Sequence, residues 1–347
     1  MAKGHINIPI FIPHEGCPNR CVFCNQHRIS GKSSFDGGSL EAEREAVRKE
    51  ISEALATVLE GQEAEVAFFG GSFTGIGRER MCGLLDVAQE FVDGGRVDAI
   101  RLSTRPDYID REILSLLAGY RVKTVELGIQ SMEDRVLLAA GRGHTAADSE
   151  RACRMVCETG FSLVGQMMTG LPLSEPEDEK RTAEKICAMG ASAARIYPTV
   201  VFPDTGLDAM ARSGDYRPPT LEEAVVRTAG ALEVFADAGI PVLRIGLHSS
   251  ESLTAPGSIS FGAYHPAMGE LVEGELYRRK IEAALKERLG TARAGTVTVY
   301  LPTGELSKGI GQNGRNREWL LRSFSPARLL FRESPALEKY RVAVEIS

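Results

Sequence analysis

The chain has few of the features that would place it in or across a membrane. None of its apolar runs reaches the roughly 18 residues that a transmembrane helix needs. The apolar stretch near the N-terminus is short and is interrupted by Asn7 and Pro9. It lacks the charged, apolar and small-residue regions of a signal peptide. We therefore expect a cytoplasmic protein without a membrane partner.

The sequence also lacks the cysteines of a disulfide framework. Its seven cysteines are odd in number, whereas disulfide-stabilised chains are typically short, secreted and even in count. Three of them, Cys17, Cys21 and Cys24, fall within eight residues, and the other four are scattered. Cys153 and Cys157 lie four residues apart in a predicted helix, where buried small apolar residues are the simpler interpretation. The three clustered cysteines need another explanation.

A large excess of basic charge is absent as well. The net charge is −6, which argues against sequence-independent binding of nucleic acid by the whole surface. The charge is uneven, because residues 296–347 hold eight lysines and arginines against five glutamates. That leaves +3 on the tail and −9 on the rest, so a local basic face is compatible with the composition. The hydrophobic fraction of 43% is ample for a folded core.

Apolar runs of strand length alternate with stretches of helical spacing along most of the chain. This alternation predicts a parallel sheet with helices outside it, and six or so units favour an α/β fold of the partial (β/α)6 barrel type. Functional sites in such folds lie at the carboxyl ends of the strands. Strands are expected at residues 6–12, 65–69, 97–103, 122–129, 161–168, 193–197 and 241–245. Helices are expected at residues 39–59, 79–92, 106–119, 132–140, 146–158, 176–189 and 220–238.

We divide the chain into three parts. Residues 1–245 are expected to form the barrel, residues 246–290 a helical extension and residues 291–347 a small basic C-terminal module. The first boundary falls in a Ser/Gly/Pro-rich stretch and the second in an Ala/Gly-rich link. The C-terminal module is predicted to be α+β. The expected elements after the barrel are a helix at 265–289, strands at 297–301 and 341–346, and a helix at 315–323.

The spacing Cys-x3-Cys-x2-Cys of Cys17, Cys21 and Cys24 suits one soft metal centre. A structural zinc site needs four ligands, usually in two separated pairs, and the chain has no second pair of this kind. His14 and His27 lie close in sequence and would complete a zinc site, so that interpretation stays open. Three cysteines on a 4Fe–4S cluster instead leave one iron open, unlike the four-cysteine clusters of electron transfer. An open iron can bind the amino and carboxylate groups of S-adenosylmethionine (SAM).

This spacing, directly after a first strand and with an aromatic residue before the third cysteine, resembles the radical SAM superfamily. The resemblance implies that Cys17, Cys21 and Cys24 hold a 4Fe–4S cluster. It also implies that the reduced cluster cleaves SAM to methionine and a 5′-deoxyadenosyl radical. The cofactors then supply the chemistry, while the protein supplies orientation and exclusion of water. A reducing electron donor is implied as a partner.

A glycine-rich turn follows the second predicted strand. Gly70, Gly71 and Ser72, with Thr74 two residues further on, resemble the superfamily's glycine motif for the methionyl amino group of SAM. Glycine lets the backbone approach a ligand closely because it has no Cβ. Ser72 and Thr74 would add hydroxyl contacts. Taken alone, the glycine pair is also consistent with a plain turn.

Three further side chains are candidates for binding SAM. Gln130 ends the fourth predicted strand and is a candidate partner of the ribose. Arg142 follows twelve residues later and suits the methionyl carboxylate, because hydrogen bonds between a guanidinium and a carboxylate are strong. Gln166 closes the fifth predicted strand and points to the same region. His144 is interpreted as a loop residue held by hydrogen bonds.

Residues 5–245 resemble the radical SAM half of the Elongator catalytic subunit, elongator protein three. The motifs that carry the resemblance are residues 103–107, 126–131, 141–145, 170–172 and 196–199. A looser resemblance is to oxygen-independent coproporphyrinogen III oxidase. Ser103 stands where both families tend to have Glu. About 60 residues follow Leu285, too few for the Elongator acetyltransferase domain, so we do not expect chemistry with acetyl-CoA.

The resemblance makes RNA, with a tRNA base favoured, the expected substrate of a radical SAM enzyme, and this rests on analogy. Residues Lys308–Arg317 form a basic Gly-x-x-Gly turn before a helix, which resembles the KH loop that contacts a nucleic-acid backbone. Arg317 stands where KH helices have an apolar residue, and a basic turn that begins a helix explains the pattern equally well. This turn and the barrel mouth are the candidate RNA contacts. Two other hypotheses remain: a coproporphyrinogen oxidase-like or haem-handling enzyme, and a non-catalytic metal-binding RNA-binding module.

Overall fold

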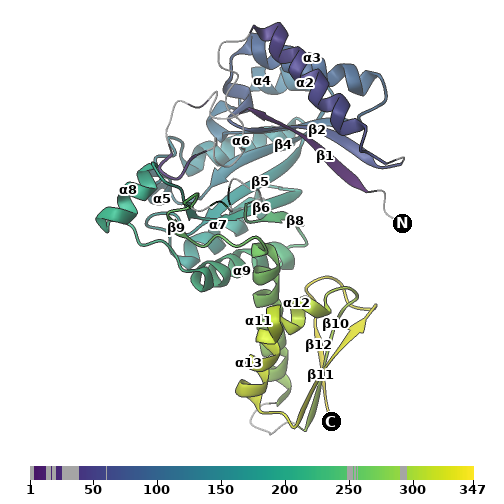
Figure 1. Cartoon of the computed structure of the whole chain (residues 1–347), viewed down its shortest axis with the longest axis vertical. Coiled ribbons are helices and arrows are strands. Elements are labelled where there is room, and N and C mark those ends of the chain that lie inside the picture. Colours follow the sequence, from purple (N-terminus) through teal and green to yellow (C-terminus); the bar gives the residue numbers. More distant parts are fainter. Residues whose placement is uncertain are drawn as a thin grey trace.

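The computed structural model contains a seven-stranded parallel sheet that curls into a half-barrel (Figure 1). It describes residues 4–12, 17, 21–25, 39–59, 61–247, 253, 255, 257–289 and 295–347. The strand order is β1-β2-β3-β4-β5-β6-β8, and every neighbouring pair is parallel. The predicted partial barrel is therefore confirmed. The strands are β1 (His5–Ile12), β2 (Glu63–Gly70), β3 (Ala99–Thr104), β4 (Val122–Gln130), β5 (Ser162–Thr169), β6 (Ala193–Pro198) and β8 (Val242–Ile245).

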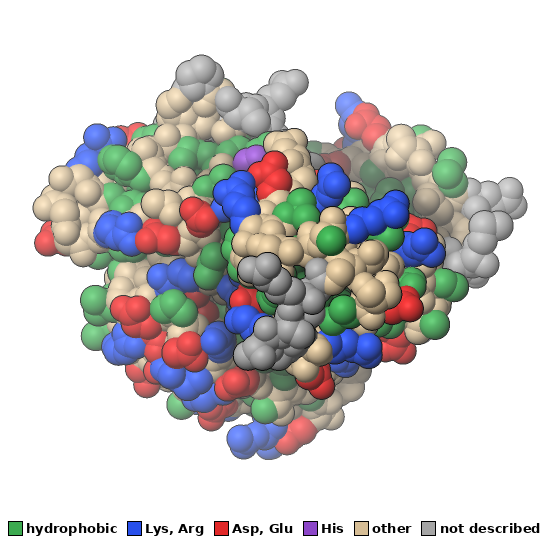
Figure 2. Space-filling view, turned by 90° about the horizontal axis from the view of Figure 1, so that it is seen from below, with side chains coloured by type: hydrophobic (Ala, Val, Ile, Leu, Met, Phe, Trp, Pro, Cys, Tyr) green, Lys and Arg blue, Asp and Glu red, His purple; other side chains and the backbone are tan. Residues whose placement is uncertain are grey.

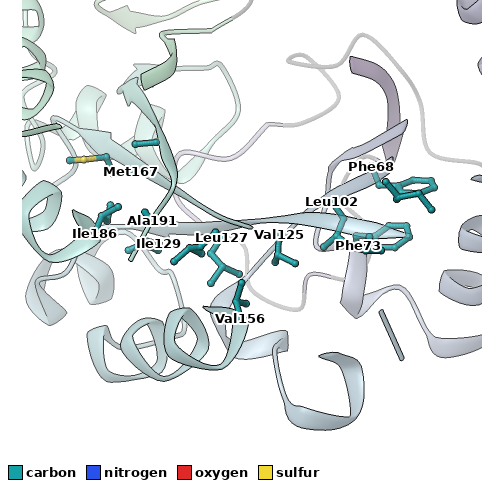
Figure 3. Close-up of a cluster of buried hydrophobic side chains, with 14 of the residues drawn as sticks. Phe68, Phe73, Leu102, Val125, Leu127, Ile129, Val156, Met167, Ile186 and Ala191 are labelled. Carbon is teal, nitrogen blue, oxygen red and sulfur yellow. The ribbon is translucent and has the colours of Figure 1, made fainter. Parts of the chain in front are cut away.

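Helices cover the convex face of this sheet and bury one side of each strand. In Figure 3, Val125, Leu127 and Ile129 of β4 share this core with Val156 of α6 and Ile186 of α7. Burial of such alternate strand residues supplies most of the driving force for the fold. The helices are α2 (Leu40–Leu55), α3 (Arg78–Asp93), α4 (Arg111–Ala118), α5 (Asp134–Ala139), α6 (Ala146–Glu158), α7 (Pro176–Ala188) and α9 (Leu221–Asp237).

Two elements of the barrel differ from the sequence-based expectation. The helix expected at 106–119 is divided into a 3-10 turn, η2 (Pro106–Tyr108), and α4. The division occurs because the Asp110 side chain accepts a hydrogen bond from the backbone N–H of Ile113 and so begins a new helix. The segment after β6, expected to be a loop, contains the short helix α8 (Gly206–Ser213) and the strand β7 (Val200–Val201), which pairs with β9 (Phe261–Gly262).

The C-terminal residues form a second, smaller sheet in the order β11-β10-β12. The long helix α11 (Met268–Leu289) contacts α9 of the barrel and also contributes Tyr277, Ile281 and Leu285 to the core under the small sheet. The strand and helix expected at 297–301 and 315–323 are present, whereas α12 and β11 were not predicted. The elements are β10 (Thr296–Pro302), α12 (Leu306–Ile310), the 3-10 turn η3 (Gln312–Gly314), α13 (Arg315–Phe324), β11 (Arg328–Ser334) and β12 (Ala343–Ile346). The domain limits themselves stay a prediction.

None of the helices in the described ranges is long and apolar enough to cross a membrane.

Candidate functional site

A cavity of about 1700 Å³ occupies the concave side of the half-barrel. Its walls are the inward-facing residues of the parallel strands and the loops at their carboxyl ends. The predicted site residues that line it are Cys17, Cys21, Cys24, Gly70, Gly71, Ser72, Gln130, Arg142 and Gln166. Thr74, which was also predicted to bind SAM, does not line the cavity. The structure thus brings together side chains that are separated by up to about 150 residues in sequence.

The segment that holds the cysteines is attached to two loops of the barrel. The backbone N–H of Val22 donates to the carbonyl of Ala140 over 3.0 Å, and the Val22 carbonyl accepts from Leu207 over 2.7 Å. The Cys24 N–H donates to the Cys21 carbonyl over 3.0 Å, so the last two cysteines lie on one tight turn. Cys21 is buried, and Cys17 and Cys24 are partly exposed to the cavity.

Two arginines face the cysteine sulfurs. Nη1 of Arg142 lies 3.4 Å from Sγ of Cys21, and Nη1 of Arg105 lies 3.7 Å from Sγ of Cys17. Within the described ranges, no three His, Cys, Asp or Glu side chains converge closely enough to hold a single metal ion. The three thiols share one cavity and two of them face fixed positive charge, an arrangement that fits a larger anionic cluster held by thiolates. His14 and His27, the extra ligands of the zinc interpretation, lie outside the described residues.

The glycine turn after β2 is attached to the strand that precedes the cysteines. The Gly71 N–H donates to the Ile12 carbonyl over 2.6 Å, and Gly70 has a φ of +105°. A Cβ on Gly70 would lie 3.0 Å from the Ile12 carbonyl oxygen, so this turn needs glycine for both conformation and space. The turn therefore exposes backbone to the cavity beside the cysteine segment.

The hydroxyl groups of this turn form hydrogen bonds with the end of the neighbouring strand. Ser72 Oγ and Thr74 Oγ1 lie 2.8 and 2.6 Å from Oγ1 of Thr104, at the end of β3. Thr74 also donates to the Tyr108 carbonyl over 2.9 Å and is buried. Ser72 lines the cavity as predicted, whereas Thr74 is placed to hold the loops after β2 and β3 together.

Arg142, Gln130 and Gln166 meet around Gly128 at the end of β4. The side-chain amides of Gln130 and Gln166 donate to each other over 2.7 and 2.8 Å. Nη2 of Arg142 donates to the Gly128 carbonyl over 2.5 Å. Its Nε is buried and has no hydrogen-bond partner among the described residues. This group presents amide oxygens, amide N–H groups and a cation to one side of the cavity.

Gln130 has a φ of +69°, which is unusual for a residue with a side chain. The conformation costs free energy and persists only where the surroundings fix it, which is a feature of ligand-binding sites. Here it accompanies a shift in register between β4 and β5.

Arg105 is a site residue that the sequence analysis did not assign, although it belongs to the 103–107 motif. It is 3% exposed, and it donates from Nε and Nη2 to the Asp107 carboxylate over 2.9 and 2.8 Å. Nη2 also donates to the Arg142 carbonyl over 2.6 Å. Burial would lower the pKa of Arg105, but the hydrogen bonds and charge of Asp107 outweigh it, and the pKa is raised. Arg105 therefore links the first cysteine to the loop of Arg142 as a permanent cation.

His144 lies behind this group, away from the cavity wall. Its side chain is 0% exposed, and Nε2 lies 3.3 Å from the Ile129 carbonyl. Burial, together with the charge of Arg142, lowers its pKa to about 4. The imidazole is neutral near pH 7 and holds the loop that contains Arg142, in agreement with its interpretation as a hydrogen-bonded loop residue.

Comparison with known families gives two matches that adjoin along the chain. The radical SAM superfamily matches residues 11–186, and a family described as a radical SAM C-terminal domain matches residues 191–278. The superfamily match spans the cysteines and every predicted site residue. The cofactors expected from the sequence, a 4Fe–4S cluster and SAM, are those of this superfamily.

Individual relatives agree with the Elongator resemblance. An uncharacterized protein of Methanocaldococcus jannaschii is 26% identical over 60% of this chain and 65% of its own length. The tRNA uridine(34) acetyltransferase of the same organism is 30% identical over 38% of this chain, and mouse Elongator complex protein 3 is 33% identical over 37%. The matched region spans about a quarter of the length of these last two proteins.

Solved structures support the fold. The Elp3 protein of Methanocaldococcus infernus, with an N-terminal deletion, superimposes with a TM-score of 0.60 over 80% of this chain and 64% of its own, at 20% identity. Coproporphyrinogen III oxidase of Escherichia coli gives a TM-score of 0.50 over 68% of this chain and 53% of its own, at 17% identity. At such identities these similarities establish the architecture.

Proposed function

Because the chain belongs to the radical SAM superfamily, we propose that it cleaves SAM reductively at a 4Fe–4S cluster held by Cys17, Cys21 and Cys24. The proposal depends on one observation: the three cysteines and the predicted SAM residues face one cavity at the carboxyl ends of the parallel strands. When bound, the cluster supplies the electron that breaks a carbon–sulfur bond of SAM. Every other contribution comes from the side chains and backbone of this cavity.

We assign the SAM contacts by the chemistry of the groups present. The backbone at Gly70 and Gly71 would approach the methionyl amino group. The unpartnered Nε of Arg142 would donate to the methionyl carboxylate, a charge-assisted hydrogen bond. Gln130 and Gln166 would exchange their two mutual hydrogen bonds for contacts with the ribose. The half-barrel would shield the reacting atoms from water.

Anaerobic reconstitution with iron and sulfide tests the cluster. Wild-type protein is expected to bind a 4Fe–4S cluster and to form 5′-deoxyadenosine from SAM after reduction, whereas Cys21→Ala should lose both properties. Cys82→Ala is the matched control, because Cys82 is half-buried and does not line the cavity. Full iron content and 5′-deoxyadenosine formation in Cys21→Ala would refute the assignment. One zinc without iron would favour the non-catalytic hypothesis.

For the substrate, we propose an RNA, with a tRNA base favoured. The support is the similarity to proteins described as tRNA uridine(34) acetyltransferase and Elongator complex protein 3, of which this chain covers only the radical SAM region. The fold similarity to coproporphyrinogen III oxidase extends no further than the architecture, so the porphyrin hypothesis has weaker support.

The C-terminal module offers a candidate RNA contact with fewer available basic side chains than the sequence suggested. Lys308 is half-buried and pairs with Glu273 and Glu305 over 2.8 and 3.0 Å, so its charge is already matched. Arg317, by contrast, is exposed beside the Gly311–Gly314 turn that joins α12 to α13. On the face seen in Figure 2, basic and acidic side chains are interspersed. Any contact with RNA here would be local.

Binding of tRNA measured against salt concentration tests the RNA proposal. We expect the affinity to fall as salt rises, and Arg317→Gln to reduce the slope by about one counterion. Arg111→Gln, which removes an exposed arginine from the barrel surface, is the control. Absence of binding, or binding without a salt dependence, would exclude this substrate.

A further inference from the structure

Five buried or half-buried charged side chains on the strands line the cavity and are not used by the SAM assignment. They are Glu65 on β2, Arg101 on β3, Glu126 on β4, Arg195 on β6 and Arg244 on β8. Arg101 precedes the cavity residue Ser103 by two positions, which places it roughly 7 Å further from the carboxyl end of β3. A closed barrel fills such positions with apolar side chains. The fold alone therefore does not explain these charges.

Two carboxylates in this region are matched by two arginines. Nε of Arg195 donates to the Glu126 carboxylate over 3.0 Å, and its guanidinium lies over the ring of Phe69. Nη1 of Arg101 lies 3.5 Å from Glu65. The four charged side chains are between 7 and 11% exposed. Burial of ions costs free energy unless they are paired, so these pairs keep the charged lining stable.

Positive charge and hydrogen-bond donors remain in excess. Nε of Arg101, a residue that is 5% exposed, has no hydrogen-bond partner in the described part of the chain. Arg244 lies beside Arg195 in the register of β8 and β6, and it makes no hydrogen bond or ion pair with another described residue. Lys123 and His5 also line the cavity, and Nε2 of His5 lies 3.3 Å from Glu65, so the cationic groups outnumber the two glutamates.

We propose that the substrate carries an oxyanion, a carboxylate or a phosphate, that binds the Nε edge of Arg101. A guanidinium edge matches the two oxygens of such a group, and Arg244 adds to the attraction. The inference rests on the proposed function, since it treats the same cavity as the place of reaction. An oxyanion held there would direct the rest of the substrate toward the carboxyl ends of the strands, where SAM is proposed to bind.

Calorimetric titration of the reconstituted holoenzyme with malonate and with inorganic phosphate tests the inference. We expect at least one anion to bind the wild-type protein and Arg101→Gln to weaken that binding roughly tenfold or more, as for loss of a charged hydrogen bond. Arg244→Gln should weaken it less and serves as a second variant if Arg101→Gln does not fold. Arg111→Gln, on the exposed start of α4, should bind as the wild type does.

The two anions distinguish the sources of the charge, because preference for phosphate indicates a phosphate-bearing substrate and preference for malonate a carboxylic acid. The inference is overturned if neither anion binds, or if both arginine variants bind as the wild type does. It also fails if Arg101→Gln weakens the binding of SAM by the same factor, since the arginine would then serve the cofactor. Iron content and 5′-deoxyadenosine formation, measured on the same samples, report separately on the proposed function.

Discussion

A single methyl group added at Gly128 should weaken the binding of SAM while leaving the iron–sulfur site intact. The Cβ of alanine there would lie 2.8 Å from Nη2 of Arg142 and 3.0 Å from Nε2 of Gln130. Both distances are shorter than ordinary van der Waals contacts. Arg142 contacts Cys21 on its other side. The guanidinium can therefore make room for the methyl group only by leaving its present position.

The magnitude follows from the contact with SAM that the displaced Arg142 loses. A hydrogen bond to a charged group is worth about 1.5–3 kcal/mol. Because 1.4 kcal/mol corresponds to a factor of ten in affinity, the Kd for SAM should rise roughly 10- to 150-fold in Gly128→Ala. Titration calorimetry with the reconstituted protein measures this change. Iron analysis of the same sample should give the wild-type value.

Gly165→Ala on the adjacent strand is a matched control. Gly165 pairs with Leu127 in the register of β5 and β4, but its Cβ would point to the helices and lie 2.5 Å from Cγ2 of Ile186. The same substitution on the opposite face should therefore lower the melting temperature and leave the affinity for SAM unchanged. If Gly128→Ala binds SAM as tightly as the wild type, or if the two variants behave alike, Arg142 does not bind the methionyl carboxylate.

Two further predictions concern groups behind the cavity. The pKa of His144 in the folded protein, about 4, lies below its unfolded value near 6.5, so the unfolded chain binds more protons in between. The free energy of unfolding should fall by up to about 3 kcal/mol as pH decreases from 7 to 4. His144→Gln should flatten this pH dependence in denaturant titrations. An unchanged pH dependence in the variant would contradict the burial of a neutral His144. Arg105→Lys keeps the charge but loses the simultaneous contacts to Asp107 and to the Arg142 carbonyl. We expect it to lower the iron retained after reconstitution, with little change in overall folding by circular dichroism, and full retention would show that Arg105 does not position the cysteine segment.

The barrel could be predicted from the sequence because each strand buries one face against helices. On β4, for example, Val125, Leu127 and Ile129 are fully buried, so the apolar pattern marks the strand clearly. Short elements without such a pattern were missed. Helix α8 buries few side chains and begins at the Thr205 cap, and β11 has exposed Arg328 and Arg332 among its apolar residues. Exposed charge of this kind is typical of an edge strand, where it prevents pairing with other chains.

The cysteine segment and the SAM motifs were recognisable because each is local in sequence. Arg105 was not, since its contacts to Cys17 and Arg142 join residues 88 and 37 positions away. Neither the hydrophobic periodicity nor the spacing of motifs in the sequence indicates such distant pairs. They arise only when the carboxyl ends of neighbouring strands meet at one edge of the sheet.

The charged lining escaped prediction for a different reason. Along β3 and β4, residues such as Arg101 and Glu126 alternate with apolar residues, a pattern that ordinarily indicates a strand with one face in water. In this half-barrel the second face is turned inward, and both side chains are more than nine-tenths buried. Alternation therefore reports that a face is not packed by apolar side chains, and it does not report whether that face meets bulk water or a cavity. A charged side chain at an inward position of a curled parallel sheet is for that reason better evidence for a bound polar ligand than the same residue on an open sheet.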